Sequence, residues 1–74
     1  MTEEKKFNVV CKIVQQFCGT EVNQMSKTSD LVEIGVNQLD VTDLLVEIEQ
    51  EFDVVLPPDA YLSIRTIGDI MYYI

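Results

Sequence analysis

The side chains of this sequence that could do chemistry are mainly carboxylates, and their spacing argues against catalysis. The chain has 13 acidic residues, five basic residues and no histidine. A hydroxyl or thiol nucleophile needs a base within hydrogen-bond reach, and without histidine only carboxylates could supply an acid–base pair. The carboxylates of residues 37–53 recur at helical spacing on one face, which is typical of a solvated surface. We therefore expect that the protein is not an enzyme.

We expect the two cysteines, Cys11 and Cys18, to form neither a disulfide nor a metal site. They are seven residues apart, which in a helix is about 10.5 Å along the axis and too far for a disulfide. No histidine or cluster of further thiols accompanies them, so no zinc site is predicted. We expect two free, buried thiols in a reducing compartment.

The negative charge is concentrated in one half of the chain, and the net charge is −8. Residues 28–64 contain nine carboxylates and no basic residue: Asp30, Glu33, Asp40, Asp43, Glu47, Glu49, Glu51, Asp53 and Asp59. Such a field repels nucleic acid and anionic lipid and attracts basic surfaces. Acidity could serve only to keep a small protein soluble, but its concentration in one segment favours a docking surface. We therefore expect a protein partner with a basic patch, and no nucleic-acid or membrane partner.

The length and the hydropathy pattern indicate one small domain, residues 1–74. No run approaches the roughly 20 apolar residues that span a bilayer. The N-terminal residues 1–6 are polar and are not followed by the apolar stretch of a signal peptide. We expect a cytoplasmic monomer.

Apolar residues at helical spacing predict the positions of the helices. Residues 3–18 form one amphipathic helix that ends before Gly19, with its apolar face made of Phe7, Val10, Cys11, Val14, Phe17 and Cys18. Residues 20–35 form a long connection, with a short helical turn near residues 30–33. Its apolar residues must pack on the bundle, because a structureless loop of that length is unusual in so small a domain.

The second helix begins at Asn37, a good N-cap, and Asp40 can act as the acid of a capping box. Its buried stripe is Val41, Leu44, Leu45, Ile48 and Phe52, and Pro57-Pro58 ends it. A short helix from residue 58 or 59 to 64 follows. A last helix, capped by Thr66, has an apolar stripe of Ile67, Ile70, Met71 and Ile74. The fold class is all-α, with three main helices and one short one.

Residues 31–40 read LVEIGVNQLD, which resembles the signature of the acyl carrier protein family, where leucine or isoleucine and glycine precede Asp-Ser-Leu-Asp. The resemblance continues through residues 44–53 (LLVEIEQEFD), through Leu56-Pro57 and through residues 66–70 (TIGDI). The first helix and the long connection also have the lengths expected in this family, so the resemblance covers nearly the whole chain. The resemblance implies an acyl-carrier-protein-like bundle.

The same resemblance identifies one departure, at Gln38. The family's serine at this position carries 4′-phosphopantetheine as a phosphodiester, and its thiol holds acyl, aminoacyl or polyketide intermediates. Gln38, flanked by Asn37 and Leu39, has no hydroxyl. Other serines do not replace it, because Ser26 and Ser29 lie in the upstream connection and Ser63 follows the prolines. We therefore expect no cofactor on this chain and, with no cargo to shelter, fuller packing between the second and third helices.

The acidic second helix matches the family's docking helix for partner enzymes. The docking residues implied are Asp40, Asp43, Val46, Glu47, Glu49, Gln50 and Asp53, with Gln50 where the family usually has glutamate. The leading hypothesis is an unprimed carrier-like module that docks to a basic surface, such as that of a carrier-using synthase or transferase. One alternative is an ordinary carrier of fatty acid or polyketide synthesis whose serine has been substituted. Another is an acidic helical inhibitor or nucleic-acid mimic.

Overall fold

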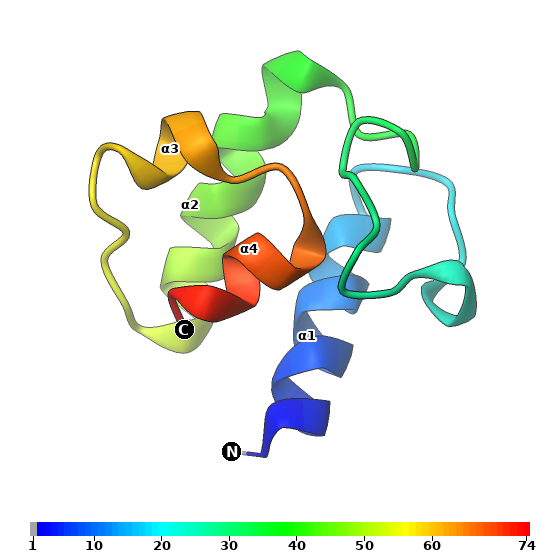
Figure 1. Ribbon diagram of the computed structural model, residues 1–74, viewed down its shortest axis with the longest axis horizontal. Helices are drawn as coiled ribbons and strands as arrows, with labels where there is room; N and C mark the ends of the chain where they lie inside the picture. Colours follow the sequence, from blue (N-terminus) through cyan, green and yellow to red (C-terminus); the bar gives the residue numbers. More distant parts are fainter. Residues whose placement is uncertain (1) are drawn as a thin grey trace.

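The computed structural model describes residues 2–74 and has four α-helices, labelled in Figure 1. These are α1 (Glu3–Gln15), α2 (Val41–Phe52), α3 (Ala60–Ser63) and α4 (Ile67–Tyr72), with 3₁₀ turns at Val22–Gln24 and Gln38–Asp40. Within residues 2–74 the β-type pairing is a single isolated bridge between Asp30 and Thr66. The predicted all-α class is confirmed, although α4 is as short as six residues.

The first helix, α1, begins as its sequence predicts and ends earlier. Thr2 Oγ1 accepts a hydrogen bond from the Lys5 N–H at 3.2 Å, which satisfies one of the free donors of the first turn. The α-helix stops at Gln15, not at Cys18. The next residues form tighter i→i−3 hydrogen bonds, including one of 2.9 Å from the Phe17 N–H to the Val14 carbonyl. The apolar spacing persists through this tighter turn, so it overstates the length of the helix.

The second helix has the predicted cap but not the predicted capping box. Asn37 Oδ1 accepts a hydrogen bond from the Leu39 N–H at 2.9 Å, and the chain enters α2 through the 3₁₀ turn Gln38–Asp40. Asp40 makes no side-chain capping bond, because this turn separates Asn37 from the α-helix proper. The helix ends at Phe52 and is capped by Asp53, whose φ of 52° is left-handed, so it stops before Pro57-Pro58.

The capping box is at the start of α4. Thr66 Oγ1 accepts from the Asp69 N–H at 3.1 Å, and Asp69 Oδ2 accepts from the Thr66 N–H at 3.1 Å. Asp69 Oδ2 also accepts from the Arg65 N–H at 2.9 Å. These backbone donors, that of Arg65 first, lower the pKa of Asp69. The carboxylate thus fixes the entry of the chain into α4.

The long connection between α1 and α2 is attached to α4 by backbone hydrogen bonds. The N–H groups of Ile67 and Gly68 donate to the carbonyls of Ser29 and Lys27 at 3.2 and 2.8 Å. The Leu31 N–H donates to the Arg65 carbonyl at 2.9 Å. A helix leaves its first N–H groups without intrahelical partners, and here the connection supplies them. The predicted turn near residues 30–33 is present, closed by Asp30 Oδ1, which accepts from the N–H groups of Val32 and Glu33.

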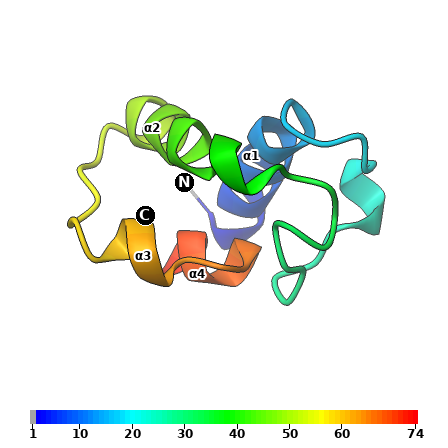
Figure 2. The same cartoon turned by 90° about the horizontal axis from the view of Figure 1, so that it is seen from above.

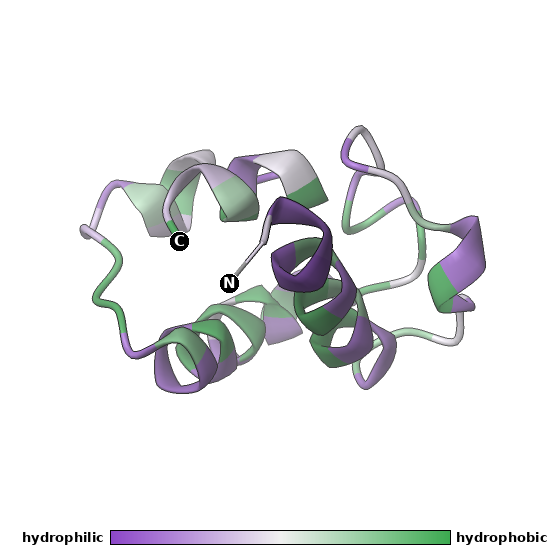
Figure 3. Ribbon diagram, turned by 90° about the horizontal axis from the view of Figure 1, so that it is seen from below, coloured by the Kyte–Doolittle hydropathy of each residue, from purple (hydrophilic) through white to green (hydrophobic). Residues whose placement is uncertain are grey.

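The core lies where α1 meets α2 and α4, as the two views of Figures 1 and 2 show. Its fully buried side chains come from these helices and from the long connection: Val10, Cys11, Val14, Leu31, Val36, Leu44, Leu45, Ile48, Ile67 and Ile70. Figure 3 shows hydrophobic and hydrophilic residues alternating around α1 and α2, as expected of helices with one buried face. The predicted apolar stripes therefore form one core.

Both cysteines are free thiols. Cys11 is buried, and this burial raises its pKa to about 11, whereas Cys18 is half-buried. Residues 2–74 contain no group of three or more histidine, cysteine or acidic side chains placed to hold a metal ion. In the same range, the helices are too short and too polar to cross a membrane.

The close approach of Gly68 to the long connection generates a prediction. Alanine usually stabilises a helix relative to glycine, but a Cβ at Gly68 would lie 2.9 Å from the Lys27 carbonyl oxygen. We expect Gly68→Ala to destabilise the protein by about 1–3 kcal/mol through overpacking, measured by urea denaturation. Gly19→Ala is the matched control, because a Cβ there meets no atom within 4 Å. An equal or higher stability for Gly68→Ala would contradict this packing.

Candidate functional site at the start of α2

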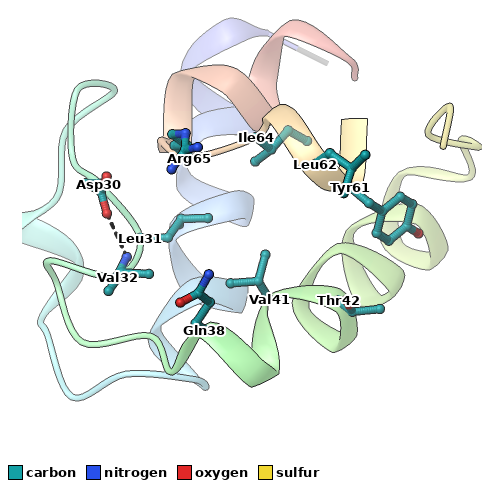
Figure 4. A pocket seen from close by; sticks show the side chains of 10 residues that line it. All are labelled: Asp30, Leu31, Val32, Gln38, Val41, Thr42, Tyr61, Leu62, Ile64 and Arg65. Carbon is teal, nitrogen blue, oxygen red and sulfur yellow. Dashed lines mark hydrogen bonds between the residues drawn. The ribbon is translucent and has the colours of Figure 1, made fainter. Parts of the chain in front are cut away.

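A groove of about 450 Å³ opens beside the first turn of α2 (Figure 4). Three segments that are distant in sequence form its walls: residues 30–32, the start of α2, and the stretch from α3 to Arg65. The side chains that line it are Asp30, Leu31, Val32, Gln38, Val41, Thr42, Tyr61, Leu62, Ile64 and Arg65.

Backbone pairing holds the walls of this groove in place. The 2.9 Å hydrogen bond from the Leu31 N–H to the Arg65 carbonyl joins residues 30–32 to the segment before α4. The Val36 N–H donates to the Leu31 carbonyl at 3.0 Å, which brings the chain back towards α2. Gly35, between them, has a φ of 115°, a conformation that residues with a Cβ rarely adopt. The buried side chain of Leu31 forms the base.

Gln38 stands at the edge of this groove with its side chain exposed. Among residues 2–74 no partner within hydrogen-bond distance is found for its carboxamide, or for the hydroxyl of Thr42. A carboxamide both donates and accepts hydrogen bonds, as does a hydroxyl. The groove therefore offers free polar groups on its α2 wall.

Packing between α2 and α3 agrees only in part with the expectation of a filled space. At depth the space is closed, because Leu44, Leu45, Ile48, Ala60 and Ile64 are buried. At the surface the groove remains open. The expectation of fuller packing is not met in this outer part, where the exposed side chains of Gln38 and Leu62 line the groove without filling it.

One of the predicted docking carboxylates, Glu49, has an internal role. Glu49 Oε2 accepts from the Leu56 N–H at 2.7 Å, and Glu49 Oε1 accepts from the Tyr61 hydroxyl at 2.6 Å. The carboxylate thus joins α2 to the following loop and to α3. The Tyr61 hydroxyl and then the Leu56 N–H lower the pKa of Glu49, and the same carboxylate raises the pKa of Tyr61.

The other predicted docking residues lie on the outer face of α2 or at its ends. Asp43, Glu47, Gln50 and Asp53 are exposed, Val46 is 38% exposed and Asp40 is half-buried. Their carboxylates have no cationic partner within 4.0 Å in residues 2–74, where the one ion pair joins Lys27 to Glu3. This outer face is therefore uncompensated negative surface.

The comparisons with known proteins agree with this arrangement. A family model described as "Phosphopantetheine attachment site" matches residues 8–74. The chain belongs to this family. It is also 29% identical to an acyl carrier protein of Prochlorococcus marinus (strain MIT 9515), over the whole of this chain and 94% of that relative. The acyl carrier resemblance of the sequence is thus supported at the level of the family, whose members work with synthases and transferases.

Three features of this site were missed by the reading of the sequence: the bond between Glu49 and Tyr61, the place of Arg65 in the groove, and the exposure of Val32 and Leu62. Val32 is 52% exposed and Leu62 is 83% exposed. Only the exposure of Leu62 could have been predicted from the sequence, because Leu62 does not share the helical spacing of the apolar residues around it. The rest depend on contacts between distant segments.

The bond between Tyr61 and Glu49 predicts a pH-dependent contribution to stability. It requires an ionised carboxylate and a protonated phenol. The lowered pKa of Glu49 makes this contribution present above the ordinary glutamate value of 4.5 and lost as the pH falls through the folded pKa. The raised pKa of Tyr61 makes this contribution fully present below the ordinary tyrosine value of 10.0 and lost as the pH rises through the folded pKa.

We therefore expect Tyr61→Phe to lower the thermal midpoint most between these two values, and to have progressively less effect in stronger acid. Thermal unfolding followed by circular dichroism across that pH range measures the difference. Tyr72→Phe is the matched control, since Tyr72 is 82% exposed and its hydroxyl has no partner among the described residues. Identical pH profiles for the two variants would refute the role of this bond.

Proposed function

We propose that this chain is an acyl-carrier-like domain that is not primed with phosphopantetheine and acts as a docking module. The observation that carries the proposal is the identity of Gln38, in the turn that leads into α2. By the resemblance, this position matches the serine to which the family attaches its prosthetic group. A glutamine carboxamide has no hydroxyl oxygen to form the phosphodiester, so the residues here do not fit the group.

The remaining serines do not offer a substitute in this proposal. Ser26 and Ser29 belong to the connection, where their hydroxyls lie 3.3 Å apart, and Ser29 Oγ also accepts from the Ser26 N–H. Ser63 is the last residue of α3. Neither place is the N-terminal turn of α2. No catalytic step is assigned to the chain, since carrier domains of this family are not catalytic by themselves.

The docking part of the proposal rests on the outer face of α2. Asp40, Asp43, Val46, Glu47, Gln50 and Asp53 would contact a basic surface of a synthase or transferase, with Glu49 contributing through the position of α3. Uncompensated carboxylates accelerate encounter with a basic partner and make binding sensitive to salt. Such interfaces are transient, and the domain would work as a monomer in the cytoplasm.

A second candidate function is an ordinary acyl carrier protein whose attachment serine has been substituted. The name of the Prochlorococcus relative, "Acyl carrier protein", fits this candidate equally well. Both candidates predict that the chain is primed when Gln38 is replaced by serine. They differ in the next step, because only an ordinary carrier then passes the loaded arm to synthase enzymes.

Priming is tested by incubating the full chain with coenzyme A and a broad-specificity phosphopantetheinyl transferase and measuring the intact mass. We expect no added mass on the unaltered chain, because it has no acceptor hydroxyl at residue 38. Gln38→Ser is the rescue variant and Gln38→Ala the matched control. Addition of one phosphopantetheine arm to Gln38→Ser alone would indicate that the recognition face of a carrier is retained.

Two other outcomes decide against parts of the proposal. An added arm on the unaltered chain would refute the claim that Gln38 prevents priming. No added arm on any of the three proteins would mean that α2 no longer docks to this transferase, and would remove the support for a carrier-type docking face.

A further inference from the structure

Residues 55–64, which include α3 and are termed the strap below, are attached to the rest of the molecule by few polar contacts. The strap lies at one edge of the fold, on the side away from the long connection (Figures 1 and 2). Among the hydrogen bonds found in residues 2–74, only two join the strap to other residues. Both end on the carboxylate of Glu49, one from the Leu56 N–H at 2.7 Å and one from the Tyr61 hydroxyl at 2.6 Å.

The other backbone hydrogen bonds of the strap stay within it. The N–H groups of residues 60–63 donate to the carbonyls of residues 57–59, and the Ile64 N–H donates to the Ala60 carbonyl at 3.0 Å. Pro57 and Pro58 have no N–H to donate. A movement of the whole strap away from α2 therefore breaks only the two bonds to Glu49.

Apolar packing also keeps the strap closed, through one narrow side of it. Leu56, Ala60 and Ile64 are buried, whereas Val55 and Leu62 are 90% and 83% exposed. Hydrogen bonds to an ionised acceptor are stronger than those between neutral groups. The carboxylate of Glu49 therefore adds to this packing as the one polar attachment of the strap within residues 2–74.

The two ends of the strap are fixed. At one end the Val54 N–H donates to the Glu49 carbonyl at 3.1 Å, where α2 is capped. At the other end the Arg65 N–H donates to Asp69 Oδ2 at 2.9 Å, and the Arg65 carbonyl accepts from the Leu31 N–H. The chain between these two ends can thus move without disturbing the entry into α4.

The two walls of the groove beside Gln38 differ in how they are held. Tyr61, Leu62 and Ile64 of the strap line one side of it (Figure 4). Residues 30–32, on the other side, continue from a segment whose carbonyls, at Lys27 and Ser29, accept hydrogen bonds from α4. One wall is therefore tied to the core through the backbone, and the other through a single side chain and its apolar contacts.

We propose that the strap is a movable wall of this groove, which opens as one unit between Val54 and Arg65 while α1, α2, α4 and residues 27–36 stay folded. The carboxylate of Glu49 controls how often it opens. Opening widens the groove beside Gln38 and uncovers the apolar side of the strap. Segments with few attachments open in this way, as cooperative units, at a lower free energy than global unfolding. This motion does not require docking to a basic partner.

The test is native-state hydrogen exchange of the full ¹⁵N-labelled chain, with urea below the unfolding transition. A helix as short as α3 is not stable by itself, so its N–H groups exchange once the strap is open. We expect the amides of Leu56 and of residues 60–64 to share one free energy of exchange and one dependence on urea. Both should be lower than for the slowest amides of α1, because opening exposes only part of the surface that global unfolding exposes.

One core substitution separates the strap from the rest of the fold. Ile13→Val removes one methylene from a buried residue of α1, which borders Glu47 and Glu51 on the α1 side of α2 and does not line the groove of the strap. It should speed exchange of the slowest α1 amides severalfold. The strap amides should keep their rates, because the open state retains this packing.

Substitutions at the attachment test the role of Glu49. Glu49→Gln should speed exchange of the strap amides about tenfold, because a carboxamide has one acceptor oxygen in place of two. Tyr61→Phe removes one of the two bonds and should give a smaller increase of the same kind. Glu47→Gln is the matched control, since Glu47 is exposed and makes no hydrogen bond to the strap. It should leave the strap amides unchanged.

Three results would overturn the proposal. If Ile13→Val speeds the strap and α1 amides by the same factor, the strap opens only when the whole chain unfolds. If Glu49→Gln leaves the strap rates unchanged, or Glu47→Gln raises them equally, Glu49 does not control the opening. The Leu31 N–H, on the opposite wall, should respond to Ile13→Val as the α1 amides do. A Leu31 amide that behaves like the strap amides would mean that the two walls do not differ.

Discussion

The start of α4 is the constraint on which the rest of this structure depends. Its first turn has N–H groups with no partners inside the helix, and they are satisfied by Thr66 Oγ1 and by the carbonyls of Lys27 and Ser29. These bonds fix the long connection after α1 against α4. The Leu31 N–H then reaches the Arg65 carbonyl, which buries Leu31 and sets one wall of the groove. Hydrogen bonding at the start of one helix thereby determines the position of the groove beside Gln38.

The acidic residues of α2 show why charge alone does not define a binding surface. Most of them point to solvent, and they account for the negative field that would steer a basic partner. Glu49, on the same helix, is bound by the Leu56 N–H and the Tyr61 hydroxyl. It holds the loop and α3 that form the far wall of the groove. One helix thus supplies both the outward charge and the internal support of the site beside it.

The proposed functions share the region around Gln38. If this position is not primed, the chain has no tethered arm, and the groove beside it is available to an external ligand. Its lining is mixed, with the exposed side chains of Val32 and Leu62 beside those of Gln38 and Arg65. The carboxylates on the outer face of α2 would then provide speed of association with a basic partner.

Much of the architecture could be predicted because it depends on neighbours along the chain. The apolar spacing located the four helices, and the caps Asn37 and Thr66 were identified from residue type and position. The errors also have local causes: apolar spacing continues through the tighter turn after Gln15, and Asp40 lies in a 3₁₀ turn that prevents a capping box.

By itself, the sequence determined the helical class, the family, the concentration of carboxylates in residues 28–64 and the absence of a hydroxyl at Gln38, because these depend only on residue identity and on short-range spacing. The tertiary structure decided that Glu49 binds Tyr61, that Val32 and Leu62 face one groove, and that Gly68 lies against Lys27. Each of these pairs is separated by 12 or more residues. Their proximity depends on how the helices and the connection pack, which the local periodicity of the chain does not encode.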